Sequence, residues 1–211
     1  MPLITQVGAG ASRDRLEKLI AERLKPGADK GAVDVRIWQL FGEEWAVMYT
    51  DLSGFSRKVV EFGIIHFLQV IAESERIFVP CIDRHDGVLL KVEGDSLMVL
   101  FRSPGKAIEC AIEMQGAAKA YNEDRPDKEK ILLCVGVGFG KVLKIGDHDV
   151  FGAEVNAASK LGEDTAKAWE ILVTDSAKDV ASQLSGISFE PIETVPPGAR
   201  AAYKVIYKEA L

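Results

Sequence analysis

The fold is decided by a hairpin at the centre of the chain, Leu89-Leu90-Lys91-Val92-Glu93-Gly94-Asp95-Ser96-Leu97-Met98-Val99. Two apolar runs, 88–91 and 96–101, flank a polar turn that contains glycine, which is a hairpin signal. An earlier apolar run ends in a similar way, in Ala46-Val47-Met48-Tyr49-Thr50-Asp51-Leu52-Ser53-Gly54-Phe55-Ser56. The two segments therefore predict strands that each end at an aspartate, Asp51 and Asp95.

The elements around this hairpin predict an α+β fold. From residue 45 to 139 the expected order is strand, helix, strand, strand, helix, strand, with Gly63 as a weak point in the first helix, 55–82. This is the ferredoxin-like βαββαβ order, whose antiparallel sheet carries both helices on one face. We also expect a helix over 153–162 and two strands, over 170–174 and 202–207. The first strand should lie beside the hairpin's second strand or between the pair, so the two aspartates can approach each other.

The N-terminal region predicts a short amphipathic helix. Leucine and isoleucine recur at helical spacing over 13–24, and Pro26-Gly27 ends the pattern. Residues 29–34 are expected to be a linker, followed by an apolar lead-in. We therefore divide the chain into an N-terminal segment, 1–44, and a main domain, 45–211. The helix either packs on its own chain or mediates a dimer.

Composition excludes several classes of protein. The 211 residues are 47% hydrophobic and 27% charged, as in a globular domain with a full core. The net charge of −6 argues against nonspecific binding to nucleic acid, but leaves room for a small anion in a local pocket. Three cysteines without motif spacing predict buried, reduced thiols. The sequence shows no signal peptide or membrane-length apolar stretch, so we expect a cytoplasmic protein without membrane contact.

The two aspartates have both structural and functional interpretations. Taken singly, Asp51 could cap a helix that starts near Ser53, and Asp95 could be a turn residue. Taken together, two carboxylates at one rim of a sheet form a hard-oxygen site suited to Mg²⁺ and phosphate. The helix start after Leu52 would add free backbone N–H groups for phosphate oxygens.

A glycine run, Gly136-Val137-Gly138-Phe139-Gly140, invites a dinucleotide-binding interpretation. It lies inside and at the end of a predicted strand rather than between a strand and a helix. This position favours close backbone packing followed by a turn.

Three segments in order resemble a known family. Residues 50–56, Thr50-Asp51-Leu52-Ser53-Gly54-Phe55-Ser56, are similar to the signature at the end of the first strand of class III adenylyl and guanylyl cyclases. Lys91-Val92-Glu93-Gly94-Asp95 resembles the second signature, and the separation of the two aspartates by 44 positions is similar to the family's spacing. Residues 151–160, Phe151-Gly152-Ala153-Glu154-Val155-Asn156-Ala157-Ala158-Ser159-Lys160, resemble a third. The resemblance covers residues 45–207 and is more specific than any one motif.

This resemblance implies a head-to-tail homodimer with active sites in the groove between the subunits. Asp51 and Asp95 match the aspartates that hold two Mg²⁺ or Mn²⁺ ions, with the Leu52 carbonyl as a further ligand. The substrate would also meet the residues that follow the first aspartate, Leu52, Ser53, Gly54 and Phe55. The implied reaction is attack of the ribose 3′-hydroxyl on the α-phosphate of a nucleoside triphosphate.

The resemblance also implies which residues select the base. Lys91 and Asp149 match the base-selecting positions, and a lysine with an aspartate resembles the adenylyl type, so ATP is the expected substrate and 3′,5′-cyclic AMP the expected product. Asn156 matches the asparagine that orients the ribose. Lys160 stands where the family has an arginine that stabilises charge on the α-phosphate, and a lysine is a point charge rather than a bidentate donor.

Two departures from the family pattern keep alternatives open. The first departure is Lys160, which stands in place of the family's arginine. The second is that the chain has no clear match to the family's C-terminal lysine that binds the triphosphate, although Arg200 and Lys204 lie near the expected place in the sequence. The alternatives are a weak or inactive cyclase fold that binds a nucleotide or a partner protein, and a cyclase that prefers GTP or a pyrimidine nucleotide.

Overall fold

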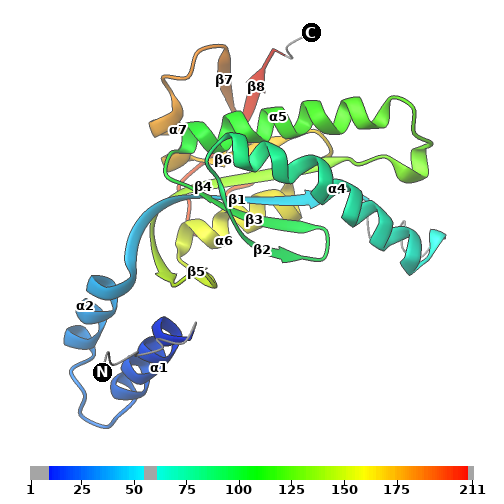
Figure 1. Cartoon of the computed structure of the whole chain (residues 1–211). Coiled ribbons are helices and arrows are strands. Elements are labelled where there is room, and N and C mark those ends of the chain that lie inside the picture. The colour runs from blue at the N-terminus through cyan, green and yellow to red at the C-terminus, as the bar shows by residue number, and fades with distance from the viewer. Residues whose placement is uncertain (1–9, 55–60, 209–211) are drawn as a thin grey trace, which may run out of the picture.

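The structure, a computed structural model, describes residues 10–54 and 61–208. A mixed sheet with the strand order β2-β3-β1-β4-β6-β8-β7 forms its centre, and helices cover both faces (Figure 1). The strands are β1 (Gly42–Leu52), β2 (Val88–Glu93), β3 (Ser96–Phe101), β4 (Leu133–Ile145), β5 (Asp149–Phe151), β6 (Ile171–Thr174), β7 (Ile187–Pro191) and β8 (Ala202–Tyr207). The helices are α1 (Ala11–Arg23), α2 (Lys30–Phe41), α4 (Ile64–Arg84), α5 (Pro104–Asn122), α6 (Ala153–Ser159) and α7 (Asp175–Ala181), with a 3₁₀ turn η1 (Asp127–Glu129) and a π-helix η2 (Lys160–Thr165).

Strand β1 lies in the middle of the ferredoxin-like core. It pairs antiparallel with β3, where Met48 faces Val99, and along its whole length with β4, from Gly42 opposite Leu143 to Leu52 opposite Leu133. Strands β2 and β3 form the predicted antiparallel hairpin. The order β2-β3-β1-β4 confirms the α+β, ferredoxin-like prediction and places β1 beside the hairpin's second strand.

The two faces of β1 belong to different layers because side chains alternate along a strand. Ala46 and Met48 belong to the main core, which α4 and α5 cover with side chains such as Phe78. Trp45 and Val47 face the opposite way and pack with residues of α6. Asp51 has the same parity as Trp45 and Val47, so it lies on the α6 face of the sheet.

The glycine run allows α6 to approach the sheet closely. A Cβ atom on Gly136 would lie 2.2 Å from the backbone oxygen of Ala158, and one on Gly138 would lie 2.5 Å from that of Glu154. Neither distance is sterically possible, so only glycine fits at these positions. The packing interpretation of this run is therefore confirmed, but the expected turn after it was wrong, because β4 continues through Gly140 to Ile145.

Several predicted boundaries were wrong. Residues 29–34 are not a linker, since Asp29 caps α2 by accepting a hydrogen bond of 3.0 Å from the backbone N–H of Ala32. The expected helix over 55–82 is interrupted at Gly63, whose φ of 85° precedes the start of α4. The expected helix over 153–162 ends as α6 at Ser159 and continues as the π-helix η2.

The structure also bears on the cysteines and on the possibility of a membrane-spanning helix. Cys81, Cys110 and Cys134 are buried and free, as predicted. Within residues 10–54 and 61–208, no helix combines the length and the hydropathy needed to cross a bilayer.

Candidate active site

The structure brings Asp51 and Asp95 together at the rim of the sheet. Asp51 is the penultimate residue of β1, and Asp95 follows Gly94, whose φ of 62° turns the hairpin. The Thr50 hydroxyl accepts a hydrogen bond of 3.0 Å from the backbone N–H of Leu97, which fixes the start of β3 against the end of β1. Both carboxyl groups are half-buried and are hydrogen-bonded to each other.

Burial and like charge perturb both groups. Burial, the negative charges of Asp95 and Glu163, and the hydrogen bond that the protonated Asp51 carboxyl donates to Asp95 raise the pKa of Asp51 to about 7, although a hydrogen bond from the backbone N–H of Leu52 opposes the shift. Burial also raises the pKa of Asp95, although hydrogen bonds from backbone N–H groups and from Asp51 oppose the shift. The pair therefore shares a proton near neutral pH, with Asp51 as the carrier. Such a pair attracts a cation, which would replace that proton.

A third carboxylate, which the sequence did not predict, approaches the pair from η2. Glu163 accepts a hydrogen bond of 3.2 Å from the Ser96 hydroxyl and another from Ser159. A π-helix turn is frequent at functional sites. Here the π-helix η2 places Glu163 in contact with Ser96, the residue that follows Asp95. Among the described residues, however, no group of three or more carboxylate, histidine or cysteine side chains is arranged to hold a metal ion.

The two predicted base-selecting residues form an ion pair. Lys91 of β2 and Asp149, the first residue of β5, are 2.9 Å apart, and each side chain is a little over one quarter exposed. Glu93 lies 3.8 Å from the Lys91 ammonium group. Burial and the charges of Glu163, Glu93 and Asp149 raise the pKa of Tyr49 to about 12. Tyr49 is therefore close enough to Glu163, Glu93 and Asp149 for their charges to act on its hydroxyl.

The residues that follow Asp51 continue the rim. Leu52 is buried, and the Ser53 backbone N–H donates to the carbonyl of Leu132 at 2.8 Å. Gly54 has a φ of 77°, a left-handed conformation that suits glycine. Phe55 lies outside the described residues, so its predicted contact with substrate stays a prediction.

Asn156 and Lys160 lie on the exposed side of α6 and η2, while Val155 and Ala158 on the other side are buried. The Lys160 ammonium group donates to Asp164 at the surface. No contact among the described residues joins either side chain to the aspartate pair. In the part of the chain that the structure describes, these two predicted catalytic residues therefore form no hydrogen bond or ion pair with the aspartates, although Lys160 lies close enough to Glu163 for their charges to interact.

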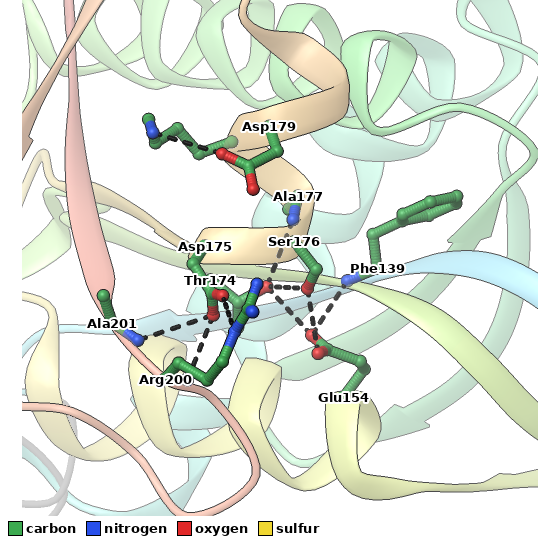
Figure 2. A network of polar contacts seen from close by, with 10 residues as sticks. Phe139, Glu154, Thr174, Asp175, Ser176, Ala177, Asp179, Arg200 and Ala201 are labelled. Carbon is green, nitrogen blue, oxygen red and sulfur yellow. Dashed lines mark hydrogen bonds and ion pairs between the residues drawn. The ribbon is translucent and has the colours of Figure 1, made fainter.

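A half-buried carboxylate on α6 fixes this helix to the sheet (Figure 2). The Glu154 carboxylate accepts hydrogen bonds from the backbone N–H of Phe139 at 3.0 Å and from the hydroxyls of Thr174 and Ser176, each at 2.9 Å. These partners come from β4, β6 and α7. This role could not be predicted from the sequence, because the partners of Glu154 are distant along the chain.

Arg200 and Lys204, the two C-terminal cations near the expected place of the triphosphate-binding lysine, each form an ion pair with a carboxylate of the same chain. Arg200 donates to Asp175 at 2.7 Å, as Figure 2 also shows. Lys204 donates to Glu170 at 2.9 Å. Neither contact adds a cation to the rim at Asp51.

Comparison with known proteins decides the family. Residues 41–200 match the family described as the adenylate and guanylate cyclase catalytic domain. The chain belongs to this family. A putative adenylate cyclase 3 from Rhizobium meliloti is 30% identical over 144 residues, which are 68% of this chain and 24% of that protein. The serine/threonine-protein kinase pkn2 of Myxococcus xanthus is 26% identical over 162 residues, 77% of this chain and 19% of the kinase. The chain thus spans about a quarter or less of these relatives.

Solved structures show the same cyclase fold. The adenylate/guanylate cyclase/hydrolase from Silicibacter pomeroyi superposes with a TM-score of 0.68 at 24% identity, covering 79% of this chain and 98% of that one. The adenylyl cyclase CyaB from P. aeruginosa superposes with a TM-score of 0.61 at 18% identity, covering 79% and 95%. The predicted resemblance to class III cyclases is confirmed.

Proposed function

We propose that this cyclase domain converts ATP to 3′,5′-cyclic AMP and pyrophosphate. The observation that carries this proposal is the ion pair of Lys91 and Asp149. Lys91 lies opposite Met98, which packs on the α6 face of the sheet, the face to which Asp51 belongs. Lys91 presents a hydrogen-bond donor and Asp149 an acceptor, 2.9 Å apart. Adenine presents the complementary pair, a ring nitrogen acceptor beside a 6-amino donor, whereas guanine presents the reverse.

The rim fits divalent metal ions. Asp51 and Asp95 offer closely spaced carboxylate oxygens, and the Leu52 carbonyl is a further candidate ligand. Mg²⁺ binds proteins through one or two carboxylates together with phosphate oxygens of the substrate, so a third protein carboxylate is not required. When bound, two Mg²⁺ or Mn²⁺ ions would increase the acidity of the ribose 3′-hydroxyl and balance the charge of the triphosphate.

The other predicted residues act on the ribose and the phosphate. Asn156 would orient the ribose by hydrogen bonding, and Lys160 would place a positive charge near the α-phosphate. Because both side chains are exposed and neither is bonded to the aspartates of its own chain, we propose that a second copy of the chain supplies them to each site. The homodimer and the cytoplasmic location both stay predictions.

Product analysis tests the proposal. The purified protein is incubated with Mn²⁺ and, in separate reactions, ATP, GTP, CTP or UTP, and cyclic nucleotides are measured by mass spectrometry. We expect cyclic AMP from ATP, at a rate that Asp51→Asn and Asp95→Asn each reduce to background. Absence of any cyclic product from all four nucleotides would refute the proposal, and cyclic GMP as the main product would refute the base assignment.

One observation favours a second candidate function, a cyclase fold that binds nucleotide without turnover. Lys160 replaces the expected arginine, and its ammonium group donates to Asp164. A single misplaced donor to the transition state costs about 10²–10³-fold in rate. This alternative predicts nucleotide binding with no product from the wild-type protein.

A further inference from the structure

A pocket of about 500 Å³ lies between helix α1 and the base-selecting pair. The side of the pocket near α1 is lined by Leu16 and Ile20 of this helix and by Leu24, which directly follows it. The other side is lined by Lys91 of β2 and by Asp149 and Phe151 of β5. Figure 1 shows α1 on the side of the sheet opposite α4 and α5, next to the β4–β5 turn. The N-terminal helix and the base-selecting residues therefore share one pocket.

A small core of its own holds α1 in this position. Leu19 is fully buried in a cluster with Val33 of α2 and Ile145 of β4. Two ion pairs also tie α1 to α2, Arg23 with Asp34 and Arg36 with Glu22, each at 2.6 Å. Because these contacts use the faces of α1 turned toward α2 and β4, its remaining apolar side chains are left to line the pocket.

The lining combines apolar walls with polar side chains, which include Arg13, Glu17 and His148 besides the Lys91–Asp149 pair. Ile20 is 41% exposed and Phe151 is 49% exposed. The Lys91–Asp149 pair supplies one donor and one acceptor. Pockets for small molecules have this composition, mostly apolar with a few polar groups that fix orientation. A purine has the matching chemistry, because its ring faces are apolar and its hydrogen-bonding atoms lie at the edge.

We propose that α1 forms one wall of the base-binding pocket and that its Ile20 and Leu24 side chains favour purine over pyrimidine bases. The inference rests on the proposed function, since it assigns the Lys91–Asp149 pair to the base. A purine has a larger ring face than a pyrimidine and reaches further from the polar pair toward α1. Apolar contact with α1 therefore adds more affinity for ATP than for CTP.

Nucleotide binding without turnover tests this assignment. The affinities of the full chain for non-hydrolysable analogues of ATP and CTP are measured by isothermal titration calorimetry in the presence of Mn²⁺. We expect Ile20→Ser to weaken binding of the ATP analogue by about 5- to 20-fold, which is the loss of part of one apolar contact, and to change binding of the CTP analogue by less than about 3-fold. Leu24→Ser, at a position that is 77% exposed, serves as a second variant that leaves the core of the hairpin intact.

Val35→Ser is the matched control. Val35 is 56% exposed on α2 and does not line the pocket, so its replacement should leave both affinities unchanged. The proposal is overturned if Ile20→Ser and Leu24→Ser bind the ATP analogue as wild type does, or if they weaken ATP and CTP analogues equally. A wild-type protein that binds the ATP analogue but makes no cyclic product would refute the proposed turnover while these binding ratios still decide the role of α1.

Discussion

Replacing Asp51 with asparagine should stabilise the metal-free protein while removing its response to Mn²⁺. Burial and the nearby carboxylates raise the pKa of Asp51 from 3.8 to about 7. Because the folded pKa lies above the ordinary value, this carboxyl group favours the folded state at low pH. That contribution is lost as the pH rises from about 4 through about 7. At pH 8 the ionised group therefore opposes folding, and asparagine does not.

The size of the effect follows from the shift. A shift of this size corresponds to at most about 4 kcal/mol, since one pKa unit corresponds to about 1.4 kcal/mol. Partial solvent exposure of the pair reduces this figure, and we expect about 1–2 kcal/mol at pH 8. For a domain of this length, that gain raises the Tm by about 2–8 °C. At pH 5 only the unfolded state has lost the proton, and about one third of the window between pH 3.8 and about 7 has been crossed, so the gain should fall to about one third of its value at pH 8.

Thermal unfolding with EDTA and with Mn²⁺, at pH 5 and pH 8, measures these effects. In EDTA at pH 8, Asp51→Asn should unfold at a higher temperature than wild type, while Asp124→Asn, at an exposed loop position, should not. Added Mn²⁺ should raise the Tm of the wild-type protein and of Asp124→Asn, but not that of Asp51→Asn. Equal Tm values for wild type and Asp51→Asn in EDTA at pH 8 would refute the reasoning, and so would an equal response of both to Mn²⁺.

Three further substitutions test other parts of the site. The double variant Lys91→Glu with Asp149→Cys should shift the kcat/KM ratio from ATP toward GTP, because it reverses the donor and acceptor facing the base; an unchanged ratio would discredit the base assignment. Lys160→Arg should raise kcat by about 10-fold or more, since a planar guanidinium can hold the α-phosphate through two hydrogen bonds, and an unchanged kcat would remove Lys160 from the reaction. Glu154→Gln should lower the free energy of unfolding by about 1–3 kcal/mol in urea titrations, because the amide nitrogen cannot accept from Thr174 or Ser176; wild-type stability would show that the network in Figure 2 contributes nothing.

The sequence predicted the elements whose signals are local. Two apolar runs around the Gly94 turn identified the hairpin of β2 and β3. The order of these elements was enough to place Asp51 near Asp95, since the ferredoxin-like order leaves few arrangements of the strands.

The features that the sequence did not predict depend on distant contacts. The spacing of Ser159 and Glu163 is that of an ordinary helix. The π-helix forms where Gly162 packs on the sheet, since a Cβ atom there would lie 2.8 Å from the backbone oxygen of Tyr49. The pairing of Lys91 with Asp149 joins two strands far apart in the chain, and only the family resemblance pointed to it.

Diffraction from crystals grown with Mn²⁺ and a non-hydrolysable ATP analogue tests the central claim most directly, because anomalous scattering locates the metal. We expect two Mn²⁺ peaks about 3.5–4 Å apart, both within about 2.2 Å of carboxylate oxygens of Asp51 or Asp95 and of phosphate oxygens of the analogue. Bound analogue with no metal at these carboxylates, or with metal bound elsewhere on the protein, would contradict the account.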